Sequence, residues 1–232
     1  MQKIVNGIVI EYSPKDENLI KLIVDKLSEK AKKIMDFFEL NEMKHFKIKI
    51  WDDLEKYKTH LIPYLKANNE EYHDWIIQHT MDGNINLLPI RLVRQTGTNK
   101  NMTESDIAIT ACHEFVHICQ QHTVKNETGS SYWFWEALAT NLGNPEDFQW
   151  IKTEFKKYIN FDEVKDVASL IEITNNSTYN YAFLVGNYML KNYPHKKMLD
   201  YIKDEPKLEK DSEKILQEAK QFYKNFKKAK IM

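Results

Sequence analysis

Two histidines four positions apart are the residues of this chain best suited by type and spacing to chemistry. They lie in the segment His113-Glu114-Phe115-Val116-His117. On a helix, residues four apart lie on the same face, so the two imidazoles can bind one metal ion. Glu114 lies about 100° further round the helix axis, where its carboxylate can reach a water molecule at that ion. Two ligands and a general base are typical of metal-assisted hydrolysis.

A carboxylate in a later hydrophobic segment is a candidate third ligand. Glu136 lies within Tyr132–Leu142, among aromatic and small apolar residues. An acidic side chain in such surroundings is costly unless it is paired or bound to a metal ion. The alternative is a half-exposed glutamate on an amphipathic helix. Two histidines and one glutamate leave the fourth tetrahedral position of zinc open, as catalytic zinc sites require. The sequence therefore predicts one zinc ion (Zn2+) per chain, bound by His113, His117 and Glu136.

The two histidines must lie on a helix, and the flanking sequence predicts one over residues 104–122. Thr103 offers a hydroxyl at the N-cap. Glu104 and Asp106 place carboxylates in the first turn, where the helix dipole favours them. Apolar residues then recur at helical spacing as far as Cys119. The predicted helix therefore presents a metal-binding face beside a face for the core.

These features together resemble the gluzincin clan of zinc metallopeptidases, whose members combine an HExxH helix with a glutamate from a later helix. The spacing from His117 to Glu136 and the segment Trp135–Ala139 are similar to those of the M1 aminopeptidase family. The resemblance implies a zincin-like fold in which His113, His117 and Glu136 bind zinc. It also implies that Glu114 is the catalytic base.

The same resemblance implies a tyrosine at the start of a later helix that stabilises the oxyanion of the reaction. The segment 178–190 offers Tyr179, with Ala182 where the family has glycine, and Tyr181 is the alternative. A phenol suits this role because it donates a hydrogen bond to a developing alkoxide without carrying charge. Both tyrosines are therefore candidate catalytic residues. The alternative interpretation is that they are ordinary core or helix-surface residues.

One departure from the M1 family bears on the substrate. Aminopeptidases of that family hold the free amine of the substrate with a glutamate on a strand, whereas the corresponding region here, 82–89, has no acid at the anchoring position. The sequence therefore favours an endopeptidase that acts on peptide or protein substrates. The alternatives are an M1-like aminopeptidase, a non-catalytic zinc-binding regulatory protein, and a helical interaction domain whose three candidate ligands lie apart. An intact Glu114 favours catalysis, because a structural zinc site needs no base.

Length and composition suit one domain with a substantial core. The chain has 232 residues, of which 42% are hydrophobic, and a formal net charge of −1. No overall field therefore recruits nucleic acid or an anionic membrane. The sequence has no apolar N-terminal segment typical of a signal peptide and no run long enough to span a membrane. We therefore expect a cytoplasmic protein, unless it is exported by another route.

The periodicity of the remaining sequence predicts an α+β fold. We expect one peptidase domain over 1–232, with a mixed α/β N-terminal lobe at 1–123 and a mainly helical C-terminal lobe at 124–232. In the first lobe we expect strands at 8–12, 45–51 and 85–93 and helices at 16–40, 52–66, 70–80 and 104–122. In the second lobe we expect helices at 132–142, 145–159, 162–172, 179–192, 195–203 and 208–229. Pro89 indicates that the strand at 85–93 lies at a sheet edge, where an extended peptide could add to it.

Overall fold

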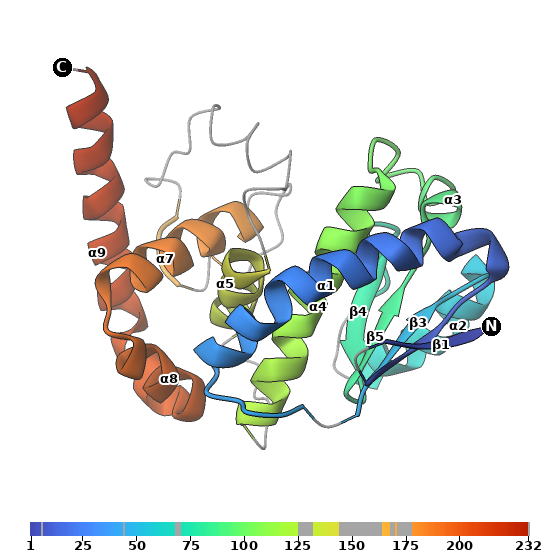
Figure 1. The fold of residues 1–232 in the computed structure, drawn as a ribbon. Coiled ribbons are helices and arrows are strands. Elements are labelled where there is room, and N and C mark those ends of the chain that lie inside the picture. Colours follow the sequence, from blue (N-terminus) through green and yellow to red (C-terminus); the bar gives the residue numbers. More distant parts are fainter. Residues whose placement is uncertain are drawn as a thin grey trace. The chain divides into compact units, whose positions relative to one another are not determined.

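The computed structural model describes residues 1–5, 7–43, 45–67, 71–124, 132–143, 164–167, 170 and 178–231 (Figure 1). For residues 178–180 and 225–231 it describes the backbone alone. The chain divides into two compact units, Met1–Cys119 and Gln120–Met232. The first combines a sheet with helices and the described part of the second is helical, so the predicted α+β class is confirmed.

The first unit is built on a five-stranded mixed sheet with the order β1-β2-β3-β5-β4 among the described residues. The strands are β1 (Gln2–Val5), β2 (Ile8–Glu11), β3 (Lys47–Ile50), β4 (Gln78–Met81) and β5 (Asn84–Leu87). β1 pairs antiparallel with β2 and β4 pairs antiparallel with β5, whereas β3 is parallel to both of its neighbours. The turn between β4 and β5 is Asp82-Gly83, whose φ angles of 51° and 67° are those of a tight hairpin turn.

Two of the elements predicted for residues 70–93 are wrong. Of the predicted helix 70–80, the described residues 71–77 are irregular and 78–80 belong to β4, which pairs with β5 across the two-residue turn. The predicted strand 85–93 ends at Leu87, and Pro89 precedes the short helix α3 (Ile90–Val93). β5 lies between β3 and β4, so it is not an edge strand, and the edge on this side of the sheet is β4.

Helices cover both faces of this sheet. The main helices of the first unit are α1 (Glu17–Phe37), α2 (Leu54–Ala67) and α4 (Glu104–Thr123), and the last turn of α4 continues into the second unit. On β4, His79 contacts α2 through Tyr57, whereas Thr80 contacts α4 through Glu114. Adjacent side chains of a strand point to opposite faces, so α2 and α4 lie on opposite sides of the sheet.

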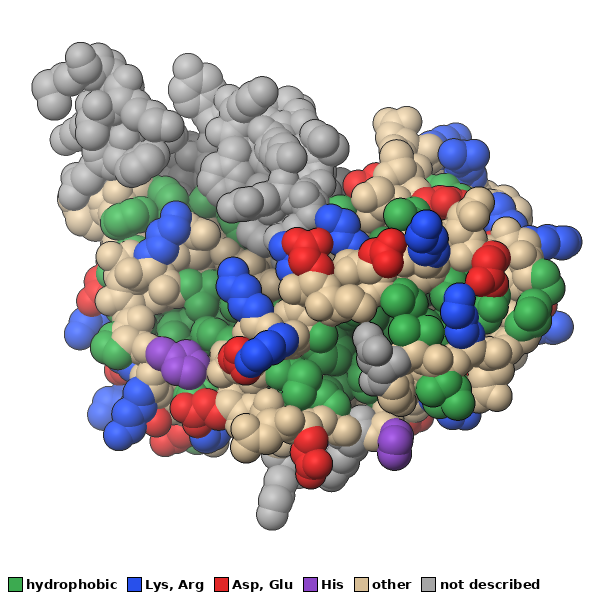
Figure 2. All heavy atoms as spheres, viewed as in Figure 1, with side chains coloured by type: hydrophobic (Ala, Val, Ile, Leu, Met, Phe, Trp, Pro, Cys, Tyr) green, Lys and Arg blue, Asp and Glu red, His purple; other side chains and the backbone are tan. Residues whose placement is uncertain are grey.

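An ion pair between the half-exposed Arg91 and the buried Asp16 joins α3 to the start of α1. Arg91 donates two hydrogen bonds of 3.0 Å to the carboxylate of Asp16, which is 5% exposed. α1 contributes one apolar stripe to the core, namely Leu19, Ile20, Ile23, Leu27 and Ile34. Figure 2 shows that positive and negative side chains alternate over the visible surface.

The described part of the second unit contains α5 (Tyr132–Leu142), α7 (Thr178–Asn192), α8 (His195–Lys203) and α9 (Glu205–Ile231). The predictions at 132–142, 179–192 and 195–203 are confirmed, whereas α9 begins three residues before 208. The predicted helices at 145–159 and 162–172 lie wholly or largely outside the described residues. No helix among the described residues has the length and apolar character needed to span a membrane.

Close packing of α5 against α7 organises this unit. A Cβ atom at Gly186 would lie 2.8 Å from the Cβ of Ala137, so glycine allows the two backbones to approach. Asn141 donates hydrogen bonds to the carbonyl oxygens of Ala137 (2.7 Å) and Phe183 (2.9 Å), one on each helix. Asn187 in turn donates to the side-chain oxygen of Asn141 (3.2 Å). The position of Glu136 is thereby fixed on a helix held by both packing and hydrogen bonds.

Candidate metal centre

The helix that carries both histidines begins with a reciprocal cap. The Asp106 side chain accepts hydrogen bonds from the Thr103 backbone N–H (2.7 Å) and hydroxyl (2.8 Å). The Asp106 backbone N–H donates back to the Thr103 hydroxyl (3.2 Å). This exchange satisfies donors that would otherwise lack partners at the first turn. The predicted helix 104–122 is therefore confirmed, and its start is set by local sequence.

His113 and His117 lie one turn apart on α4 and direct the same ring atom at a common point. Their Nε2 atoms are 3.2 Å apart, and the two ring planes are inclined at 77°. Two imidazole nitrogens bound tetrahedrally to zinc at 2.0–2.1 Å would lie about 3.3 Å apart. His113 is buried and His117 is half-buried. The spacing of the pair thus fits a shared metal ion.

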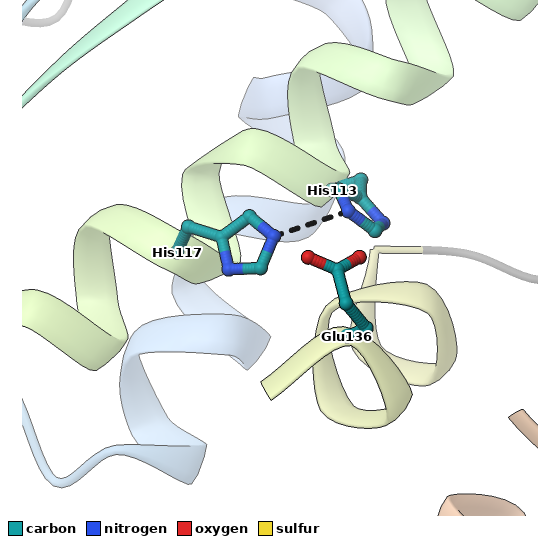
Figure 3. Close-up of side chains that lie close together, drawn as sticks. All are labelled: His113, His117 and Glu136. Atoms are coloured by element: carbon teal, nitrogen blue, oxygen red, sulfur yellow. Dashed lines mark hydrogen bonds between the residues drawn. The ribbon is translucent and has the colours of Figure 1, made fainter. Parts of the chain in front are cut away.

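Glu136 on α5 joins the two histidines. The ligand atoms of the three residues lie within 4.8 Å of one another, and the Glu136 side chain is buried. In Figure 3 the carboxylate points towards the space between the two imidazole rings. Two nitrogen donors and one carboxylate in a buried cluster form a group that could hold a metal ion. The structure therefore brings together the three residues predicted as ligands.

A hydrogen bond from the end of α4 helps to hold α5 in position. The Gln120 side chain, 1% exposed, donates to the backbone oxygen of Trp135 at 3.0 Å. Gln120 lies three residues after His117 on the same helix, and Trp135 directly precedes Glu136. The bond therefore links the helix of the two histidines to the residue next to the third ligand. Sequence patterns alone do not indicate this role for Gln120.

Glu114 directly follows His113 on α4, is buried, and is not a member of the ligand group. Its Oε2 accepts a hydrogen bond of 2.7 Å from the hydroxyl of Thr80 on β4. The same hydroxyl lies 3.2 Å from the Glu114 backbone oxygen. Thr80 was not predicted as a site residue, because its segment has been assigned to a helix. The signal that could have identified the strand is Asp82-Gly83, a dipeptide typical of hairpin turns.

The structure describes the side chain of Tyr181 but only the backbone of Tyr179. Tyr181 is buried on α7, in the second unit. The backbone of Tyr179 belongs to the first turn of α7, but its side chain lies outside the described atoms. Stabilisation of an oxyanion by either residue stays a prediction.

A second polar residue on β4 lies on the opposite face of the sheet. Nδ1 of His79 lies 3.2 Å from the Tyr57 hydroxyl, and its Nε2 is buried without a hydrogen-bond partner among the described residues. Burial, and to a smaller extent the nearby His60, lowers the pKa of His79 from 6.5 to about 3. The strand turns the His79 side chain towards α2, which half-buries the ring.

Comparisons with protein-family models, with curated proteins and with solved structures found no match for this chain. The inference of function therefore depends on the ligand group, on the carboxylate beside it and on the strand that contacts that carboxylate.

Proposed function

We propose that this protein is a zinc metallopeptidase with a gluzincin-like site on a zincin-like fold. The observation that carries the proposal is the convergence of His113, His117 and Glu136 beside a buried carboxylate outside their group. Two histidines and one glutamate are the ligand set of catalytic zinc sites that keep a position open. A structural zinc site would use four protein ligands and would gain nothing from the base.

The residues of this chain divide the work of hydrolysis. When bound, zinc supplies Lewis-acid chemistry that polarises a carbonyl and makes water more acidic. Glu114 accepts a proton from the attacking water and delivers it to the leaving amine nitrogen, so the carboxylate is restored at the end of the cycle. A tyrosine of α7, Tyr179 or Tyr181, donates a hydrogen bond to the developing oxyanion.

The edge strand β4 supports a peptide as substrate. The backbone N–H of Leu88 donates to the oxygen of Ile77 at 2.9 Å. In an antiparallel pair only every second residue bonds to the partner strand, so His79 and Met81 also direct their backbone groups to β5. By this alternation the backbone groups of Gln78 and Thr80 point away from β5, towards the open edge. An extended chain can add to these groups as a further strand, next to the residue that contacts Glu114.

The chemistry of the same hairpin favours an endopeptidase. Asn84 accepts a hydrogen bond from the backbone of Lys47 (2.9 Å), and Asn86 accepts one from the Trp51 indole (3.0 Å). These side chains are neutral and have structural partners, so they make poor anchors for a cationic amine. A desolvated ammonium group requires a carboxylate partner. The site is therefore suited to an internal peptide bond.

A substitution of the base tests this proposal. Glu114→Gln removes the proton acceptor but none of the metal ligands, so it should retain zinc and lose about 10²- to 10⁴-fold in peptide hydrolysis. Glu104→Gln makes the same chemical change in the first turn of α4 and serves as the control. Zinc content and cleavage of a peptide library are measured on all three proteins. Cleavage by Glu114→Gln at the wild-type rate would refute the mechanism, and a zinc-loaded wild type without activity would favour a regulatory zinc protein.

A further inference from the structure

The strongest polar contact to the proposed base comes from a threonine on the edge strand. At 2.7 Å the hydroxyl of Thr80 donates to Oε2 of Glu114, a charge-assisted hydrogen bond of the stronger kind. Because the hydroxyl has one proton, its longer contact of 3.2 Å with the Glu114 backbone is secondary. One oxygen of the carboxylate is thus engaged by the protein, and this bond restrains the rotation of the carboxylate.

Thr80 also belongs to the strand that would hold the substrate. Its side chain points to the face of the sheet covered by α4, whereas its backbone N–H and C=O point to the open edge. A peptide paired with β4 would therefore be bound by the backbone of the residue whose side chain holds the base. This arrangement fixes the distance between a scissile bond and Glu114 through a single residue.

We propose that Thr80 is the positioning residue for Glu114, orienting its carboxylate relative to a peptide bound at β4. This inference rests on the proposed peptidase function. A chain of two hydrogen-bonded groups, threonine to glutamate to water, would present the free carboxylate oxygen to the water. Residues that orient catalytic groups in this way typically contribute 10- to 100-fold to activity.

Two substitutions separate the hydroxyl from the shape of the side chain. Thr80→Val retains the size of the side chain and the backbone of β4 but removes the donor, so kcat should fall about 10- to 100-fold with KM little changed. Thr80→Ser restores a hydroxyl and should recover most of kcat. Thr96→Val removes another buried hydroxyl, one that donates to the Val93 backbone, and is the control. Zinc content should be equal in all four proteins.

A kcat of Thr80→Val equal to that of the wild type would overturn the positioning role, as would a failure of Thr80→Ser to recover it. A parallel loss of zinc or a rise in KM alone would also overturn it, because either would assign Thr80 to metal binding or to substrate docking.

A stability cycle tests the contact without any activity. Urea unfolding is measured for wild type, Thr80→Val, Glu114→Ala and the double variant, all without metal. If the hydroxyl acts on the carboxylate, Thr80→Val should destabilise the wild type much more than it destabilises Glu114→Ala. Equal effects in both backgrounds would refute the contact. If the protein is an active peptidase but the effects of Thr80 and Glu114 on stability are independent, only the positioning role of Thr80 is overturned. If the two effects are coupled but the zinc-loaded protein is inactive, the proposed peptidase function is overturned, and the positioning role falls with it.

Discussion

Acid should destabilise this protein through His79, a half-buried histidine on the strand beside the site. His79 has a pKa of about 3 in the folded protein, chiefly because its ring is buried, against 6.5 for the exposed ring. Between these values the unfolded chain binds a proton that the folded chain does not. The stability contributed by the neutral ring is therefore fully present above pH 6.5 and is lost as the pH falls towards 3.

The size of the effect follows from the two pKa values. Each pH unit below 6.5 costs about 1.4 kcal/mol for one such group, so His79 alone should cost about 2 kcal/mol at pH 5. Urea unfolding of the metal-free protein at about pH 7 and pH 5 measures the loss, and far-UV circular dichroism follows it. His79→Gln has no proton to bind in either state.

The comparison of wild type with His79→Gln isolates this group, because the carboxylates, the ligand histidines and His60 remain in both proteins. The wild type should lose about 2 kcal/mol more than the variant between the two pH values. If both proteins lose the same amount, the ring is not held neutral by burial. The account of β4 as a strand packed beneath α2 would then be wrong.

Two further predictions concern the substrate and the second unit. Peptides with acetylated N-termini should be cleaved as readily as the same peptides with free amines, since Asn84 and Asn86 of β5 are neutral and offer no carboxylate to an ammonium group. A strict requirement for the free amine, measured by mass spectrometry of the products, would indicate an aminopeptidase. Gly186→Ala should reduce the free energy of unfolding by about 1–3 kcal/mol, because the added methyl would lie 2.8 Å from Ala137; an unchanged urea midpoint would show that α5 and α7 can separate at little cost.

The candidate ligands could be predicted from sequence because their signals are local. The spacing of His113 and His117 needs only a helix, and Thr103 and Asp106 define the start of that helix within four residues. Glu136 was identified by its chemical mismatch with an aromatic segment, which is also a local property. The structure places all three in one group.

The wrong predictions concern segments whose structure depends on pairing across the sheet. The residues around His79 and Thr80 form a strand because β5 pairs with them. Their sequence shows no alternation of apolar and polar residues that would indicate this pairing. Pro89 predicts an edge strand by its lack of a backbone N–H, whereas in the structure it precedes the short helix α3 after β5 has ended. Thr80 and Gln120 were missed for the same reason, since each acts through a partner distant in sequence.

Zinc binding by defined variants is the most direct test of the central claim. Metal-free wild type is equilibrated with zinc at neutral pH, and bound metal per chain is measured by elemental analysis after removal of free ions. The wild type and the surface variant His195→Ala should each hold about one zinc ion, whereas His113→Ala, His117→Ala and Glu136→Ala should each lose most of their affinity. A folded wild type that takes up no zinc, or a Glu136→Ala variant that binds it as tightly as the wild type, would contradict the site.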